Sequence, residues 1–232
     1  EEDDFEIFEK IAHIDFNQIR VGTIDKLAEE TMREYKEPGT NQPVKIENFV
    51  ANSAMIKVLS ENDTYKNKDL QDYLKELTGR EKFDEPSKMS QIILEIKDRI
   101  YYDKVDIDQL YDSIKDNKGM VKVLECIKGF EDILKARNTI DFTMLENMFL
   151  HYLKENKLDL FLDEVKIVLI DEYQDTNLIQ EDIYFTIAKS AIANDGNITV
   201  VGDDDQSLYR FRGATVDLFT NYKKRAKDKL GI

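Results

Sequence analysis

Several residue types are scarce in this sequence, and each scarcity excludes a class of protein. The single cysteine, Cys126, excludes an internal disulfide framework and fits a reducing, cytoplasmic setting. Two histidines, His13 and His151, are too few for a Cys/His metal site, so both are interpreted as ordinary surface or half-buried residues. No apolar run approaches the roughly 18 residues of a membrane span, and the acidic start does not resemble a signal peptide. The sequence therefore predicts a cytoplasmic protein with no membrane contact.

One glycine-rich motif is also missing. None of the nine glycines lies in a G-x-x-x-x-G-K-[ST] pattern. That loop provides the backbone N–H groups and the lysine that hold the β- and γ-phosphates of a bound nucleotide. By itself the sequence therefore has no phosphate cradle of this kind.

Positive charge is scarce relative to negative charge. The net charge is −15, with 35% charged and 41% apolar residues, which is a globular composition with a heavily charged surface. Phosphate binding needs local clusters of Lys and Arg, so this balance counts against a nucleic-acid protein without excluding one. The only dense basic cluster, residues 223–229, is interpreted as a solvated helix face. We therefore predict that the chain alone binds DNA weakly.

The first two thirds of the chain are predicted to be mainly helical. Residues 18–24 are predicted as a short strand and residues 25–35 as a helix, and the Pro and Gly residues at 38–43 then mark a boundary. Residues 46–138 have a helical pattern throughout. One helix face there is defined by apolar residues at helical spacing, namely Met89, Ile92, Ile93, Ile96 and Ile100.

The pattern changes after residue 141. Residues 165–170 are almost continuously β-branched, as expected of a strand buried on both faces of a parallel sheet. A helix over 178–193, a second strand over 197–201 and a helix from about residue 215 follow. This order indicates an α/β fold with parallel strands, in which ligands bind at the carboxyl ends of the strands. The helical middle is interpreted as an insertion into that α/β domain.

Acidic residues directly follow the first of these strands. Asp171 and Glu172 end the apolar run, and Mg²⁺ prefers such hard oxygen ligands and keeps several waters. A neighbouring carboxylate can orient or deprotonate an attacking water. The alternative interpretation is a surface turn rich in Asp and Asn.

A second polar segment follows the next strand. Asp203, Asp204 and Asp205 precede Gln206, whose amide can contact a phosphate oxygen without adding charge. Leu-Tyr-Arg-Phe-Arg-Gly-Ala comes next, over residues 208–214. Aromatic residues interleaved with arginines are typical of single-strand platforms, where bases stack and the backbone is held. The alternative is a helix start with both aromatic rings in the core.

Together these segments resemble a known family. D-E-Y-Q-D-T-N at 171–177 and V-G-D-D-D-Q-S-L-Y-R-F-R-G-A at 201–214 resemble motifs II and III of UvrD/Rep-type superfamily 1 DNA helicases. Residues 21–27 resemble the family's G-T-F-H-S-L segment, and residues 141–145 its D-F-D-D-L segment. The resemblance spans most of the chain but is sharp only over about 165–214.

The resemblance implies an ATP- and Mg²⁺-dependent enzyme. It assigns Asp171 to Mg²⁺, Glu172 to activation of the hydrolytic water, and Gln206 to sensing the γ-phosphate. Gln174 belongs to the implied nucleotide-binding residues. The implied fold is part of a RecA-like (P-loop NTPase) parallel-sheet domain with an all-helical insertion subdomain.

The resemblance also implies contacts with single-stranded or junction DNA. Thr23 would touch a DNA phosphate, Tyr209 and Phe211 would pack on bases, and Arg212 would contact the same strand. Asp25 stands where the family has His, and it would repel a phosphate. Phe211 stands where the family more often has Trp, so the stacking surface is smaller.

These expectations give a division of the chain. Residues 1–37 and 141–232 are expected to form two parts of the motor domain, and residues 38–140 the helical insertion. The chain is expected to be a fragment of a 3′-to-5′ helicase, inactive alone, without the phosphate-binding loop and the second motor domain. A helicase–nuclease is a close alternative. The contrasting alternative is a non-catalytic scaffold or partner-binding module.

Overall fold

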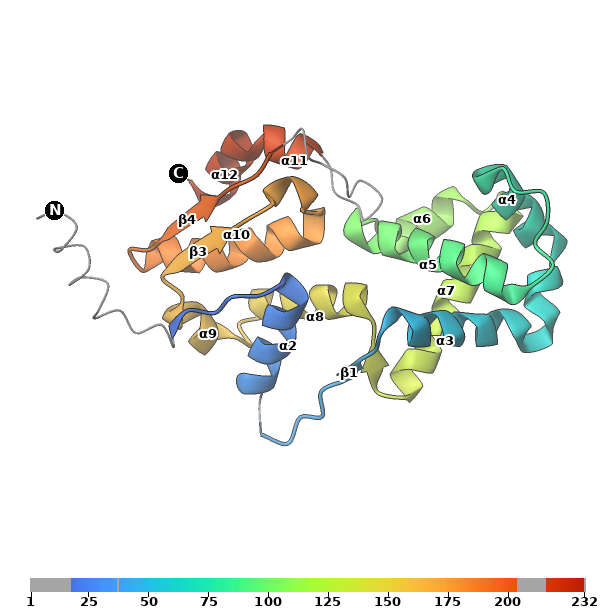
Figure 1. Ribbon diagram of the computed structural model, residues 1–232, viewed down its shortest axis with the longest axis horizontal. Coiled ribbons are helices and arrows are strands. Elements are labelled where there is room, and N and C mark those ends of the chain that lie inside the picture. Colours follow the sequence, from blue (N-terminus) through green and yellow to red (C-terminus); the bar gives the residue numbers. More distant parts are fainter. Residues whose placement is uncertain (1–17, 37, 204–215, 232) are drawn as a thin grey trace, which may run out of the picture.

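The computed structural model describes residues 18–36, 38–203 and 216–231. Its elements form two groups along the longest axis of the molecule (Figure 1). One end holds the helices α3 (Asn48–Ser60), η2 (Glu61–Lys66), α4 (Lys68–Thr78), α5 (Pro86–Tyr102), α6 (Ile107–Ser113) and α7 (Lys118–Ala136). The rest consists of α2 (Ile24–Glu34), α8 (Phe142–Lys154), α9 (Asp159–Glu164), β3 (Ile167–Ile170), η3 (Tyr173–Asp175), α10 (Leu178–Ala193), β4 (Asn197–Val200), α11 (Val216–Thr220) and α12 (Tyr222–Leu230).

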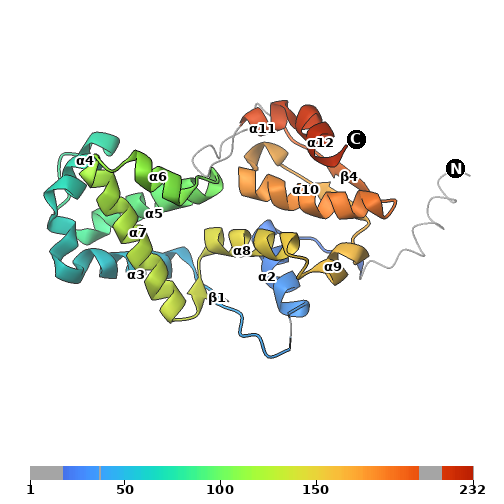
Figure 2. The same cartoon turned by 180° about the vertical axis from the view of Figure 1, so that it is seen from behind.

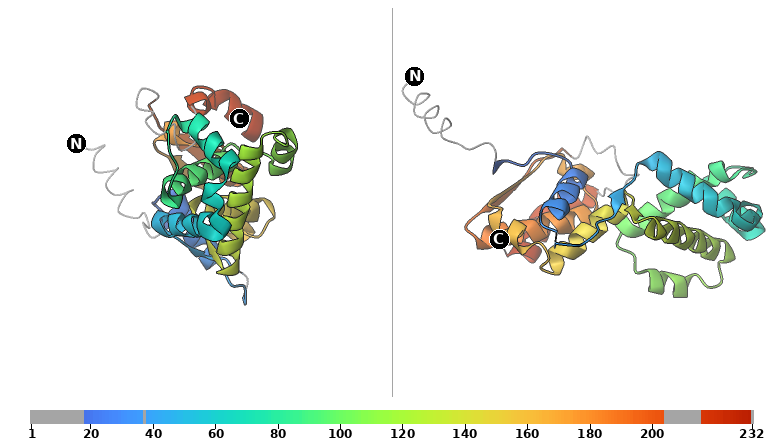
Figure 3. Two further views of the ribbon diagram at one scale, coloured as in Figure 1. Left: turned by 90° about the vertical axis from the view of Figure 1, so that its right-hand side faces the viewer. Right: turned by 90° about the horizontal axis from the view of Figure 1, so that it is seen from below.

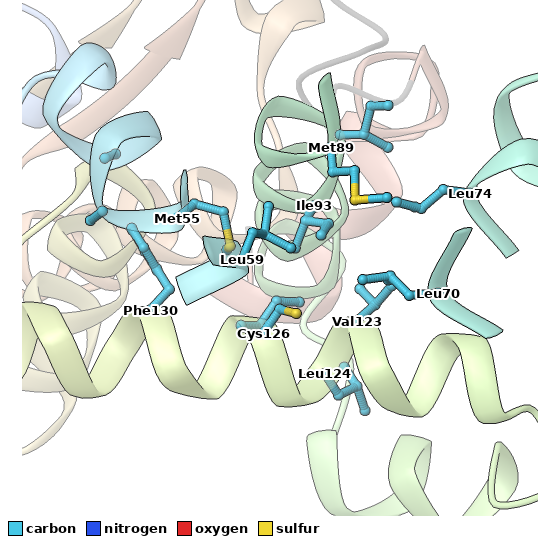
Figure 4. Packing of buried hydrophobic residues seen from close by; sticks show 14 of the residues in the cluster. Met55, Leu59, Leu70, Leu74, Met89, Ile93, Val123, Leu124, Cys126 and Phe130 are labelled. Atoms are coloured by element: carbon cyan, nitrogen blue, oxygen red, sulfur yellow. The ribbon is translucent and has the colours of Figure 1, made fainter. Parts of the chain in front are cut away.

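The helical end has its own hydrophobic core. Met55, Ile93 and Phe130 come from three different helices and are completely buried against one another (Figure 4). The apolar face predicted from residue 89 onward lies on α5 and packs into this core, which confirms that part of the helical prediction. α7 approaches α4 closely at Gly119, where an added Cβ would lie 2.3 Å from the Cβ of Tyr73.

The helical end joins the rest of the chain through a short parallel strand pair. β1 (Val44–Lys45) pairs with β2 (Thr139–Ile140), with Val44 opposite Thr139. Figure 2 and the right-hand view of Figure 3 show the helical end and the sheet end side by side, with this pair between them. The sequence prediction did not include these strands, because two residues are too short for a period-2 pattern.

A buried ion pair lies at the same junction. Lys97 of α5 is 1% exposed and donates to the carboxylate of Asp141, and its ammonium lies 2.9 Å from Asp98. Asp141 also caps α8, since its Oδ1 accepts from the backbone N–H of Met144 at 3.0 Å. Burial disfavours the ammonium, but the two carboxylates outweigh it and the pKa of Lys97 is raised.

The other end is a mixed α/β unit. β3 and β4 pair in parallel, with Ile167 opposite Asn197 and Ile170 opposite Val200. α10 connects them and covers one face of the sheet (Figure 1). It spans the predicted residues 178–193, because Asn177 and Gln180 form a capping box at its start. The predicted helix over 25–35 is confirmed as α2, and the predicted strand at 197–201 as β4.

Two predictions about strands were wrong. Residues 18–24 form no strand: residues 19–23 are extended or irregular, Val21 is 83% exposed, and α2 begins at Ile24. β3 is buried on one face only, with Ile167 67% and Leu169 73% exposed. The cause is that, among the described residues, the two-stranded sheet is covered by α10 on a single side. In the described part of the chain, no helix is both long and apolar enough to cross a bilayer.

Candidate functional site

The predicted carboxylates lie at the carboxyl edge of the β3–β4 sheet. Asp171 and Glu172 directly follow β3, and both are exposed. The chain after β4 runs alongside them, because the Val201 N–H donates to Ile170 O at 2.8 Å and the Tyr173 N–H donates to Val201 O at 3.0 Å. The two polar segments are therefore brought together at their described ends, as the parallel-sheet interpretation predicts.

A tight turn fixes the direction of the Glu172 side chain. Glu172 has φ +51° and ψ 41°, in the left-handed region that non-glycine residues rarely occupy, and its N–H donates to Asp171 Oδ1 at 2.9 Å. Such a conformation persists only where surrounding contacts enforce it. Here the Gln174 amide donates to Glu172 Oε2, and Gln174 Oε1 accepts from the Asp203 N–H at 2.9 Å. Gln174 thus bridges the two strand ends.

The donor set suits a cation. Among the described residues, no Lys or Arg forms an ion pair with Asp171 or Glu172. No group of three or more His, Cys, Asp or Glu side chains in the described ranges could enclose a metal ion. Mg²⁺ is commonly held by one or two carboxylates together with water and nucleotide phosphates, so this open pair fits that ion.

Gly202 allows the two strand ends to approach this closely. An added Cβ would lie 2.5 Å from Gln174 Oε1 and 2.8 Å from a ring carbon of Phe219. Gly202→Ala is therefore expected to destabilise the chain by about 1–3 kcal/mol through overpacking. Chemical denaturation would measure the change.

Gly22→Ala provides the control for this substitution. Its added Cβ would meet only the flexible Lys26 side chain, with the nearest atom at 3.2 Å. We expect a change within about 0.5 kcal/mol there, as for an ordinary surface substitution. Equal effects of the two substitutions would show that the contacts of Gly202 are not needed.

Beneath the turn lies a buried charged network. Tyr173 is completely buried, and its hydroxyl donates to Glu181 Oε1 of α10 at 2.9 Å. The Arg225 guanidinium of α12 donates to both oxygens of Glu181, through Nε at 2.7 and 2.9 Å. The hydrogen bond to Glu181 raises the pKa of Arg225, and burial raises the pKa of Tyr173. The sequence predicted a solvated helix face at residues 223–229, but Arg225 of this cluster pairs with a buried carboxylate.

Asp182, the next acidic residue of α10, forms ion pairs with three lysines from other parts of the chain. Asp182 receives hydrogen bonds from Lys104 and from Lys229, the latter at 2.6 Å, and Lys154 lies 3.5 Å away. Burial would raise the pKa of Asp182, but the hydrogen bonds from Lys104 and Lys229 outweigh it and lower the pKa to about 2. Asp182 therefore connects α10 to α8, to α12 and to the segment that follows α5.

Thr23, which the resemblance assigns to a DNA phosphate, has a structural role at the start of α2. It caps α2, with its Oγ1 accepting from the Lys26 N–H at 3.3 Å, and it is exposed. Burial is the main cause of the raised pKa of the Glu146 carboxyl, and the charge of half-buried Asp25 raises that pKa further. The charge of Asp25 is thus directed partly into the protein. Gln206, Tyr209, Phe211 and Arg212 lie outside the described residues.

Sequence reasoning did not identify Glu181 and Arg225. One signal was available: Glu181 is four residues before Phe185 and three after Leu178, so an acidic residue interrupts an apolar helix face. A buried carboxylate needs a cationic partner. The sequence alone does not indicate which of the basic residues provides it.

Comparison with known proteins gives the family. The model of the UvrD/REP helicase N-terminal domain family matches residues 5–227, and the chain belongs to this family.

Individual relatives match shorter segments. The chain is 38% identical over 112 residues to an ATP-dependent helicase/nuclease from Bacillus pumilus, covering 44% of this chain and 9% of that protein. It is 41% identical over 92 residues to ATP-dependent DNA helicase Rep from Buchnera aphidicola, covering 39% and 13%. It is 36% identical over 138 residues to an ATP-dependent helicase/nuclease from Staphylococcus haemolyticus, covering 56% and 11%. The matched segments are thus a small part of these relatives.

Proposed function

We propose that this chain forms the carboxylate side of the Mg-ATP site of an ATP-dependent 3′-to-5′ DNA helicase. The observation that carries the proposal is the arrangement of Asp171 and Glu172 at the carboxyl edge of two parallel strands, with Gln174 bridging to Asp203. The names of the relatives support ATP and DNA as ligands. The direction of movement rests on the resemblance of the motifs alone.

The residues have separate roles in this proposal. Asp171 would hold Mg²⁺, which when bound neutralises charge on the transferred phosphoryl group. Glu172 would orient the attacking water and accept its proton, because its carboxylate is exposed and held by the Gln174 amide. Gln206 would contact the γ-phosphate, and Gln174 would keep Glu172 and the second strand end in register.

The DNA-binding part rests on Thr23, Tyr209, Phe211 and Arg212. Exposed Thr23 offers a hydroxyl at a helix N-terminus, where an anion is favoured. The aromatic residues would stack on bases of single-stranded DNA, and Arg212 would hold the backbone. A helicase with these ligands would work in the cytoplasm.

We further propose that β3 and β4 belong to a larger RecA-like parallel sheet. Ile167, Leu169 and Val201 are 67%, 73% and 59% exposed, although parallel sheets are normally covered on both faces. No G-x-x-x-x-G-K-[ST] motif occurs in these 232 residues, so in this proposal another polypeptide segment would provide the phosphate cradle. Residues 38–140 would be the insertion subdomain, and residues 1–37 and 141–232 would be two parts of the first motor domain. A second motor domain would be its partner.

Glu172→Gln tests the catalytic part of the proposal. We would replace the N-terminal-domain segment of the Buchnera Rep helicase that corresponds to the family model by residues 5–227, and measure Mg-ATP hydrolysis with and without single-stranded DNA. DNA-stimulated turnover is expected in the chimera. Loss of the general base should lower kcat by about 10²–10⁴-fold.

The chain alone and a neighbouring amide serve as controls. The chain alone is expected to show no turnover, because it has no phosphate cradle. Asn177→Ala removes the cap of α10 and a side-chain interaction with Glu146, and neither involves Glu172, so it should lower stability by about 1 kcal/mol and leave kcat within about twofold. A chimera that hydrolyses ATP equally well with Glu172→Gln would refute the proposed role.

A further inference from the structure

Tyr173 is a buried residue of the turn at residues 171–175, which is named the catalytic turn for its proposed role. Its neighbours Glu172 and Gln174 carry the proposed chemistry, while its own ring is fully buried between α10 and the last two helices. The ring packs edge-to-face on Tyr222, with 5.2 Å between centroids, and lies 6.5 Å from the Phe219 ring. Movement of this ring would therefore move the backbone that aims Glu172.

The position of Tyr173 depends in turn on a fully buried carboxylate. Glu181 is 0% exposed, and such a charge is costly unless it is paired and hydrogen-bonded. Arg225 is the cation paired with it, and Tyr173 is the neutral donor. Without Arg225, the Glu181 carboxylate would have to bind a proton or shift to contact water. Either change would disturb the hydrogen bond that it accepts from the Tyr173 hydroxyl.

Arg225 stands on the helix pair that follows the predicted DNA-contacting residues. Asp203, at the end of β4, contacts the catalytic turn because its N–H donates to Gln174 Oε1. Further along the chain, α11 contacts the same turn by packing on η3. α12 then carries Arg225 back to Glu181. The described residues on either side of 204–215, Asp203 and α11, therefore both contact the same turn.

We propose that Arg225 is a positioning residue that holds Glu172 in its left-handed turn through Glu181 and Tyr173. The inference rests on the proposed function, because it makes α12 a link between the DNA-contacting segment and the water-activating carboxylate. Arg225 itself touches neither nucleotide nor DNA in this scheme.

Amide hydrogen exchange of the full chain tests the link. In Arg225→Met the N–H groups of Tyr173 and Asp203 should exchange about tenfold faster or more, because a buried carboxylate has lost its partner. The double variant Glu181→Gln, Arg225→Met should return toward the unchanged chain. The neutral amide introduced at position 181 needs no cation, and its oxygen can still accept from the Tyr173 hydroxyl.

Lys229→Met is the matched control. Lys229 also joins α12 to α10, through Asp182, but it has no contact with Glu181 or Tyr173 among its hydrogen bonds. Exchange at Tyr173 and Asp203 should stay within about twofold, as for a partly exposed ion pair. Equal acceleration in both variants, or acceleration of the α7 core amides as well, would mean a general loss of stability and would overturn the inference.

The chimera separates this inference from the proposed function. Arg225→Met should lower kcat about tenfold or more while KM for ATP changes less, since the effect acts on the water-activating group. If Glu172→Gln abolishes turnover but Arg225→Met alters neither exchange nor kcat, the inference about Arg225 fails. If exchange responds as expected but Glu172→Gln leaves turnover unchanged, the network stands and the proposed function fails.

Discussion

Lys97→Met is expected to lower the free energy of unfolding by about 3–5 kcal/mol, the range for breaking a buried ion pair. Methionine keeps most of the side-chain volume, so the loss comes from charge. Asp141 would remain 5% exposed without its cation, at the point where the chain leaves the helical end and enters α8. Chemical denaturation at neutral pH, followed by circular dichroism, would measure the change.

A matched pair on the same helix gives the control. Lys88 of α5 pairs with Asp84 at 2.5 Å, but both side chains are well exposed, so Lys88→Met should leave the free energy of unfolding nearly unchanged. The double variant Lys97→Met, Asp141→Asn should recover much of the loss, because Asn still caps α8 but carries no charge. A loss below about 1 kcal/mol for Lys97→Met would show that water or a bound proton compensates the Asp141 carboxylate, and that the charge of Lys97 is not needed there.

The helices could be predicted because their signals are local. Asn177 and Gln180 mark the start of α10, and Pro86 stands at the first position of α5, so spacing and caps set the bounds. The strands could be placed but their burial could not. Exposure of Leu169 depends on what covers the sheet, and residues 18–24 form no strand because strand formation needs a pairing partner that local sequence does not specify.

In the candidate site, too, the local features could be predicted from the sequence and the long-range contacts could not. Asp171 and Glu172 follow directly from a strand-end pattern, and the parallel pairing that brings Asp203 next to Gln174 follows from the strand–helix–strand order. The supporting contacts are not local. Glu181 and Arg225 are 44 residues apart, as are Lys97 and Asp141, and side-chain chemistry allows many other pairings. Only the packed structure selects among them.

Glu146→Gln is expected to stabilise the chain at alkaline pH. Burial, and next the charge of Asp25, raise the pKa of Glu146 to about 8, while Gln180 lowers it less by donating at 2.7 Å. A carboxyl with a raised pKa stays protonated in the folded chain and ionises in the unfolded chain. Its contribution to stability is therefore complete below the unfolded pKa of 4.5 and is lost as pH rises to about 8.

The stabilisation by Glu146→Gln should depend on pH, because it follows from the shifted pKa of Glu146. Near pH 8.5, Glu146→Gln should raise the free energy of unfolding by about 2–4 kcal/mol, and near pH 5 by less than about 1 kcal/mol, since each pKa unit corresponds to about 1.4 kcal/mol. Denaturation curves over that pH range would show the two chains converging as the pH falls. Glu155→Gln should not produce this alkaline gain, because Glu155 is exposed and Lys157 lowers its pKa.

Parallel pH profiles for the unchanged chain and Glu146→Gln would mean that Glu146 is already ionised in the folded protein. In that case a cation or ordered water, and not a bound proton, would have to compensate the buried Oε2, which has no hydrogen-bond partner among the described residues.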